Sequence, residues 1–228
     1  MRNLAAVLFI GGLGFFLFVL FFHLPLGAPP MVAGAAILEE GGETVGAANL
    51  VTAVLLAYRG MDTLGELSIL FAAATAVGLV LGRRQLVVSD PEGGFILRAG
   101  SDLLFPLLLV VGLYVILHGH LTPGGGFQGG VILAAAFFVP VLARPRRGLD
   151  HGLLSFVEGL AGAAFIGIGL WALFARDAFL EPLLGKGVLG HLFSAGTLPL
   201  LSMAVGLKVG AELAGLMTSL MEAEGRES

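Results

Sequence analysis

Three ionisable residues lie inside a long apolar segment of this chain, in the stretch Tyr-Arg-Gly-Met-Asp-Thr-Leu-Gly-Glu that begins at Tyr58. In a helix, Arg59 and Asp62 would be three residues apart, and Asp62 and Glu66 four apart, so all three would share one face. A charge in a membrane helix is costly, and it therefore faces protein or water and commonly marks an ion pathway. One arginine cannot neutralise two carboxylates, which favours a pathway over an ion pair that only locks two helices together.

The two carboxylates are expected to have different roles. Asp62 lies nearer to Arg59 in sequence and is the predicted ion-pair partner. Glu66 lies one helical turn further into the apolar run, where burial and the nearby Asp62 favour its protonated form and Arg59 opposes it. A carboxylate whose two protonation states are closely balanced can take up and release protons. We therefore predict that Glu66 is a proton relay.

A second unusual stretch is His-Gly-His-Leu-Thr-Pro-Gly-Gly-Gly-Phe-Gln-Gly-Gly, which begins at His118. The apolar run after it, 131–143, would give only about 20 Å of helix, too little to cross a membrane. The helix is therefore expected to begin near Gly126, with a glycine turn that dips into the membrane. Glycine permits tight turns and close helix approach, and the turn residues are Pro123, Gly124, Gly125, Gly126, Gly129 and Gly130. No Gly-Lys-Ser/Thr follows, so a phosphate-binding loop is disfavoured.

Other ionisable residues offer further candidates. His118 and His120 are two apart and do not face each other on a helix, so a metal pair is not expected, although either could relay protons. Glu158 lies inside an apolar segment, and Lys208 and Glu212 form an i,i+4 pair inside another. We predict no metal site and no cofactor. Asp102, by contrast, is expected in a first helical turn, where it favours the helix dipole.

The composition indicates a polytopic membrane protein. The 228 residues are 57% hydrophobic and only 12% charged, against about 25% charged in soluble domains. The 36 glycines suit close helix packing in lipid. The absence of cysteine excludes disulfides and thiolate metal sites. A net charge of −4 gives no indication of nucleic-acid binding.

We predict an all-α fold of about six transmembrane helices. A segment of 48–81 would give about 51 Å of continuous helix, well beyond the hydrocarbon core of about 30 Å. It must therefore break near Gly60 or Gly65, either into a short helix that ends at Tyr58 and a spanning helix from Met61, or by a π-bulge. Residues 25–47 are expected to form an exposed loop, with at most a short turn at 31–38. The expected helices are 4–24, 48–81, 101–118, 126–143, 152–174 and 189–217.

The arginines and lysines predict the orientation in the membrane. With a cytoplasmic N-terminus, six helices place Arg176 and Lys186 outside and leave Arg59 and Lys208 within the membrane. Both termini are then cytoplasmic, as the positive-inside rule favours. The inside residues are Arg2, Arg83, Arg84, Arg98, Arg144, Arg146, Arg147 and Arg226.

Both unusual stretches resemble parts of Mrp-type cation/proton antiporters. The first is similar to the "FRGFDTLGE" segment of the large MrpA component, and to the E component of archaeal membrane-bound hydrogenases. The second resembles the "GHxxPGGGFxGG" signature of the MnhB/MrpB component. The resemblance implies an MrpA-type segment over 1–83, a cytoplasmic connector over 84–94 and an MnhB-type domain over 95–228.

The resemblance implies a subunit of a large assembly in the cell membrane that exchanges Na⁺ for H⁺, with other hydrophobic subunits and lipid as its partners. On this reading the chain is part of a transporter and is not itself an enzyme. Two alternatives remain open. The chain could belong to the membrane arm of a redox-driven complex related to respiratory complex I, of the hydrogenase or sulfane-reductase type. It could also be a purely structural subunit whose charges hold neighbouring chains.

Overall fold

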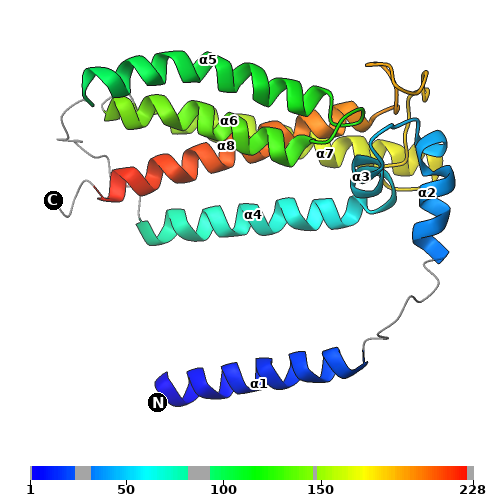
Figure 1. Cartoon of the computed structure of the whole chain (residues 1–228), viewed down its shortest axis with the longest axis horizontal. Helices are drawn as coiled ribbons and strands as arrows, with labels where there is room; N and C mark the ends of the chain where they lie inside the picture. The colour runs from blue at the N-terminus through cyan, green and yellow to red at the C-terminus, as the bar shows by residue number, and fades with distance from the viewer. Residues whose placement is uncertain (1, 24–31, 82–92, 146–147, 225–228) are drawn as a thin grey trace. The chain divides into compact units, whose positions relative to one another are not determined.

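The computed structural model describes residues 2–23, 32–81, 93–145 and 148–224, and these residues contain helices and turns without a strand (Figure 1). Five of the helices, α4 to α8, are long and apolar enough to span a membrane, and a shorter apolar segment lies in α1. The predicted all-α polytopic fold is therefore confirmed. The helices are α1 (Arg2–His23), α2 (Val32–Val45), α3 (Leu50–Ala53), the π-helix η1 (Val54–Tyr58), α4 (Gly60–Leu81), α5 (Phe95–Leu117), α6 (Gly126–Ala143), α7 (His151–Arg176) and α8 (Leu198–Glu224).

Some predictions fall on residues outside the described part of the chain. These are the last residue of the first expected helix, Leu24, the first residues of the expected loop, 25–31, nearly all of the connector 84–94, and four of the cytoplasmic arginines: Arg83, Arg84, Arg146 and Arg147. The end of the tail, 225–228 with Arg226, also lies outside it.

The chain divides into two compact units, 1–37 and 38–228. In the first unit, α1 is apolar on every side, and each of its described side chains is exposed. Phe18 and Phe22 lie one turn apart, with ring centroids 4.5 Å from each other. A helix without a polar face is suited to lipid or to another apolar helix.

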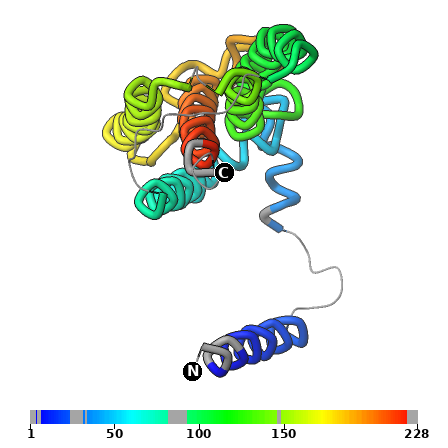
Figure 2. Tube along the Cα trace, turned by 90° about the vertical axis from the view of Figure 1, so that its left-hand side faces the viewer, coloured from blue at the N-terminus to red at the C-terminus, as the bar shows by residue number. Residues whose placement is uncertain are grey.

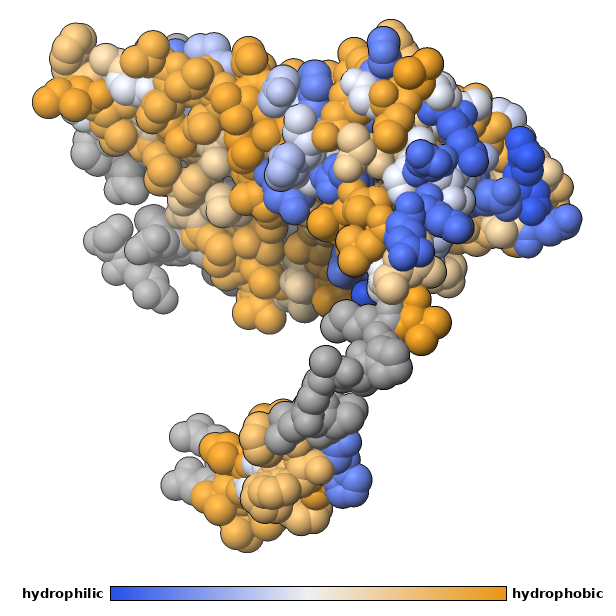
Figure 3. Space-filling view, turned by 45° about the vertical axis from the view of Figure 1, so that its right-hand side comes forward, coloured by the Kyte–Doolittle hydropathy of each residue, from blue (hydrophilic) through white to orange (hydrophobic). Residues whose placement is uncertain are grey.

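In the second unit α8 is the central helix. It packs against α4, α5, α6 and α7, and in Figure 2 its red tube lies in the middle of the bundle. Phe165 of α7 and Leu201, Val205 and Val209 of α8 belong to the buried core. The surface is also largely apolar: in Figure 3 apolar residues cover much of the visible face, and hydrophilic residues gather toward one end.

Glycines allow α6 and α8 to lie very close together. A Cβ atom added to Gly126 would lie 2.6 Å from the backbone oxygen of Ser202, and one at Gly130 would lie 2.8 Å from the oxygen of Gly206. Both distances are too short for real contacts, so larger residues would separate the helices. Small residues at a spacing of four are typical of such interfaces. The predicted Gly126/Gly130 pair therefore faces α8, whereas Gly125 precedes the helix.

Four predicted boundaries are wrong, and one of them is the end of α8, which lies at Glu224 and not at 217. Residues 32–45 form helix α2 instead of a loop, because Ala, Ile, Leu and Glu favour helix and the stop comes only at Gly46, with φ +79°. Helix α5 begins at Phe95 and not at Ser101, because Phe95, Ile96 and Leu97 extend its apolar side beyond Arg98 to the N-cap at Gly94. Helix α8 begins at Leu198 and not at 189, because the preceding segment folds into turns, with positive φ at Gly190, Ala195 and Gly196.

Candidate functional site

The predicted break in the second membrane segment is present, and it combines both expected forms. The short helix ends in the π-turn η1, in which the Arg59 amide donates to the Val54 oxygen at 2.8 Å. Arg59 itself has φ −124° and ψ 32°, outside helical geometry. The Thr63 hydroxyl donates to the Leu55 oxygen at 2.7 Å, so a side chain of α4 bonds a backbone carbonyl of η1 across the break. Side chains commonly satisfy backbone groups at a break in a membrane helix.

The predicted ion pair between Arg59 and Asp62 is also present. The Arg59 Nε donates to an Asp62 carboxylate oxygen at 2.6 Å. Both side chains are more than half exposed, and Glu66 is exposed as well. Within this chain the premise that Glu66 is buried is therefore wrong. The reason is that α4 turns Thr63 and Leu67 inward, so Asp62 and Glu66, one position earlier in each turn, lie on the open face.

The buried charges are found instead between α7 and α8. The Lys208 ammonium donates to Glu212 Oε2 at 2.9 Å and lies 3.5 Å from Glu158 Oε1. The side chains of Lys208, Glu212 and Glu158 are 9%, 1% and 19% exposed. We call these three residues the Lys208 cluster. The predicted Lys208–Glu212 pair is confirmed, and the structure adds Glu158 from the neighbouring helix.

Helix α4 also contacts the Lys208 cluster. The Lys208 ammonium lies 5.3 Å from the centre of the Phe71 ring, within the range of a cation–π contact. On the other side, the aliphatic stem of Lys208 lies beside Gly162 of α7, where a Cβ would meet its carbons at an ordinary contact distance of 3.7 Å. The lysine is therefore held where three candidate membrane helices meet.

The charges of the Lys208 cluster do not balance. One ammonium faces two carboxylates, and Glu212 Oε1 is buried without a hydrogen-bond partner among the described residues. Buried charges are costly unless they are paired and hydrogen-bonded. Neutrality therefore requires one further positive charge, which a proton on a carboxylate or a cation beside it would provide.

The two candidate histidines have separate environments. His118 caps α5, where its ring stacks on Tyr114 at 4.1 Å. His120 is fully buried in the following turn, and its Nε2 lies 3.1 Å from the Leu192 oxygen. Burial lowers the pKa of His120, while contacts with the backbone of His191 and Leu192 act in the opposite direction. No hydrogen bond or ion pair joins either ring to the Lys208 cluster in the described residues, which also contain no metal-binding group of three ligands.

The broken helix and the glycine turn, far apart in sequence, are joined by hydrogen bonds. The Asn49 side-chain amide donates to the backbone oxygens of Gly119 at 2.7 Å and Thr122 at 2.8 Å. The Thr52 hydroxyl also donates to Gly119, at 2.6 Å. Neither Asn49 nor Thr52 was predicted as a site residue. The available signal was the position of Asn49, because asparagine before an apolar run is a typical N-cap.

Asp102 has a different role from the one predicted. It is the eighth residue of α5, beyond the first turn, and its carboxylate accepts two hydrogen bonds from Arg144, at 2.8 and 2.7 Å. A bidentate pair of this kind fixes geometry as well as charge. The helix-dipole interpretation is therefore wrong, and Asp102 ties the start of α5 to the end of α6.

The family of this chain is shown by its MnhB-type region. The profile described as "Domain related to MnhB subunit of Na+/H+ antiporter" matches residues 96–215, which contain the glycine turn and the Lys208 cluster. The chain belongs to this MnhB-related family. An uncharacterized protein of Methanocaldococcus jannaschii is 32% identical over 199 residues, which is 75% of each chain. A K(+)/H(+) antiporter protein of Rhizobium meliloti, named as an A/B component, is 26% identical, over 62% of this chain and 17% of its own length.

Two solved structures contain chains similar to this MnhB-related protein. In the membrane-bound sulfane sulfur reductase, an archaeal respiratory membrane complex, one chain is 37% identical, with a TM-score of 0.78, over 96% of this chain and 97% of that one. In the Mrp complex of Dietzia sp. DQ12-45-1b, one chain of 24% identity has a TM-score of 0.72, over 96% of this chain but 26% of that one. The second likeness shows a shared fold. Both neighbours are subunits of large membrane complexes.

Proposed function

We propose that this protein is an integral subunit of a multisubunit Mrp-type Na⁺/H⁺ antiporter module, and that its Lys208 cluster forms part of the ion path. The observation that carries the proposal is the uncompensated carboxylate: the buried Lys208 ammonium faces two carboxylates where α7 and α8 meet, one on the buried Glu212 and one on Glu158, which is 19% exposed. Intramembrane ionisable residues are functional candidates because their cost is otherwise unexplained.

The unbalanced charge suggests a simple exchange. With Lys208 charged, a proton added to either carboxylate converts it to a carboxylic acid and neutralises the cluster. Loss of that proton restores the negative charge, which a passing cation can then balance. Proton and cation therefore compete for one negative charge, and such competition is the elementary requirement for antiport.

The exposed charges of α4 have a complementary role in this proposal. Asp62 and Glu66 lie on the open face of α4, while Phe71 of the same helix contacts Lys208. In an assembled complex that face would be covered by another hydrophobic subunit. Glu66 would then be buried by the partner, and we retain it as a proton relay between subunits.

We further propose that the chain is a fusion of an MrpA-type segment over 1–83 and an MnhB-type domain over 95–228. The MnhB-related match covers about half of the chain, whereas the similarity to the Rhizobium K(+)/H(+) antiporter protein extends over 62% of it. The positive-inside bias supports a location in the cell membrane with both termini in the cytoplasm.

The decisive experiment is Na⁺-dependent proton flux in vesicles that contain the intact complex. Glu158→Gln, Glu212→Gln and Lys208→Met should each reduce flux at least tenfold per assembled complex. Glu40→Gln, on the exposed face of α2, is the matched control. Normal flux in all three cluster variants, with normal abundance, would show that the cluster is only a structural tie between α7 and α8.

A second function is favoured by the sulfane sulfur reductase neighbour, because that chain matches along nearly its whole length. In this case the subunit would belong to the membrane arm of a redox-driven pump, with the same ion chemistry driven by electron transfer elsewhere in the complex. The polypeptides that copurify with the tagged chain separate the two functions. An iron–sulfur or dehydrogenase-type subunit among them would support the redox complex, and antiporter subunits alone would support a stand-alone antiporter.

A further inference from the structure

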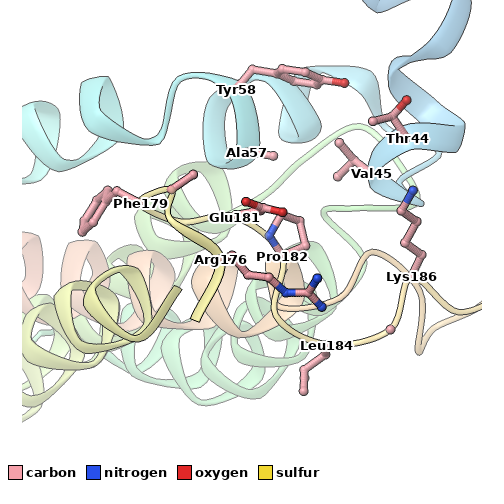
Figure 4. Close-up of a pocket in the computed structure, with 12 residues that line it drawn as sticks. Thr44, Val45, Ala57, Tyr58, Arg176, Phe179, Glu181, Pro182, Leu184 and Lys186 are labelled. Carbon is pink, nitrogen blue, oxygen red and sulfur yellow. The ribbon is translucent and has the colours of Figure 1, made fainter. Parts of the chain in front are cut away.

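A second charged region lies away from the Lys208 cluster, in a cavity of about 510 Å³ at the end of the second unit where α7 ends and α4 begins (Figure 4). One wall comes from the end of α2 and from η1. The other comes from the last residue of α7 and the segment that follows it. The lining includes Tyr58, Arg176, Phe179, Glu181 and Lys186.

The cavity is lined by three charged side chains. Arg176, Glu181 and Lys186 form no ion pair with any residue that the structure describes. Figure 4 shows that their side chains enter the space between η1 and the segment after α7. Together they carry one net positive charge, and the hydroxyls of Thr44 and Tyr58 lie on the same lining. The cavity therefore offers cations and hydrogen-bond donors to an anion with a single negative charge.

The position of the cavity indicates the source of that anion. Arg176 is the last residue of α7 and Tyr58 lies two residues before α4, and both helices are candidate membrane spans. Tyrosine, arginine and lysine at the ends of spans usually lie at the level of the lipid headgroups. The rest of the lining is apolar, with Val45, Ala57, Phe179 and Leu184. A free anion in water would make no favourable contact with this apolar part of the lining. The glycerol and upper acyl carbons of a lipid would pack against it.

We propose that this cavity binds the phosphodiester headgroup of a membrane phospholipid. Arg176 and Lys186 bind the phosphate oxygens, Tyr58 donates a hydrogen bond, and the apolar lining contacts the glycerol region. The single negative charge of a phosphodiester matches the net charge of the lining. Glu181 disfavours headgroups with additional negative charge. The lipid would fill the space between η1 and the segment after α7.

The test is photocrosslinking of the purified complex with phosphatidylglycerol that carries a photoreactive group near its glycerol. Labelling is measured on the band of this subunit and mapped to peptides within 174–190. The double variant Arg176→Gln/Lys186→Gln should reduce this labelling at least fivefold. Glu181→Gln removes the only negative charge of the described lining and should increase it. Opposite effects of two charge-removing variants cannot arise from general loss of folding.

Competition identifies the ligand. Excess unlabelled phosphatidylglycerol or phosphatidylethanolamine should prevent the labelling, because both contain the phosphodiester. Inorganic phosphate at the same concentration should have little effect. If phosphate competed as well as the lipids, the cavity would be a site for small anions and the lipid proposal would be wrong. Unchanged labelling in the double variant, or labelling spread evenly over the spanning helices, would overturn the proposal. The result does not depend on whether the Lys208 cluster moves ions.

Discussion

The side chain of Asn49 donates a 2.7 Å hydrogen bond to the backbone oxygen of Gly119, seventy residues further along the chain. The same side chain accepts from the amides of Val51 and Thr52 as the N-cap of α3. One residue therefore starts the broken helix and attaches it to the glycine turn. The two stretches that are most unusual in the sequence are parts of one structure.

Replacement of Asn49 should destabilise the complex more than the loss of an ordinary helix cap. A cap alone contributes about 1 kcal/mol, and Asn49→Ala also leaves the Gly119 and Thr122 oxygens without its amide. Asn49→Asp keeps the acceptor of the cap but sets a carboxylate oxygen against the Gly119 and Thr122 oxygens, so it should also destabilise the complex although the cap is retained. Thermal unfolding of the purified complex measures the stability of the wild type and of the two variants. A melting temperature of Asn49→Asp equal to that of the wild type would show that the tie to the turn has no energetic role.

Gly126→Leu should prevent assembly more than it changes ion chemistry. Any side chain at this position meets the backbone of α8 at Ser202, and α6 cannot move away without losing its contacts. Gly125→Leu should act similarly, because Gly125 has φ +136°. Gly167→Ala is the control, since its Cβ would meet no atom within 4 Å. The measure is complex abundance beside flux, and an intact complex with selective loss of transport would place the turn on the pathway.

Glu66→Gln and Asp62→Asn should affect the protein differently. Glu66→Gln is expected to preserve assembly and to reduce proton-coupled transport strongly. Asp62→Asn should reduce assembly as well, because Arg59 loses its ion-pair partner and would be covered by another subunit without a counter-charge. Sodium-dependent flux and the abundance of the complex are measured together. Normal flux in Glu66→Gln would exclude the relay.

The stability of the complex should decrease as the pH falls below about 6.5, which is the ordinary pKa of a histidine side chain. Burial lowers the pKa of His120, so the folded protein binds fewer protons than the unfolded chain in this range. The stability that is present above the pKa of His120 in the unfolded chain is then lost as the pH falls through its lower pKa in the folded protein. Thermal unfolding from pH 8 to pH 5 measures the loss. His120→Gln should flatten this dependence, and His23→Gln, at an exposed position of α1, should not.

Hydrophobic partner subunits should remain bound in mild detergent. The face of α4 that carries Asp62 and Glu66 is open, and α1 has no buried described side chain. Such surfaces require lipid or another subunit. Size-exclusion chromatography with mass determination checks the expectation, which a stable monomer without any other polypeptide would contradict.

The sequence was most informative where the backbone had to be irregular. Length and glycine content together predicted the break near Gly60 and the start of α6 at Gly126, since neither apolar run fits a membrane otherwise. The i,i+3 and i,i+4 rules predicted the pairs of Arg59 with Asp62 and of Lys208 with Glu212. These features depend on local spacing, which a single sequence contains.

Contacts between distant segments could not be predicted in the same way. Glu158 joins Lys208 from another helix, and Arg144 holds Asp102 across 42 residues; no local pattern pairs them. The face of α4 that is buried depends on α8 as well, and this is why Glu66 was wrongly expected to be buried within the chain. The helical character of 32–45 was hidden by its acidic and glycine residues.

The central position of α8 has a consequence for biosynthesis. Because α8 follows α4 to α7 along the chain, the ribosome delivers it after the helices that pack around it. Glu158 must therefore enter the membrane with α7 before Lys208 is available to pair with it. During that interval the half-inserted chain carries an unpaired carboxylate, and the faces of α4 to α7 that later pack on α8 lack their partner helix. A translation pause before residue 198 would lengthen the lifetime of this intermediate.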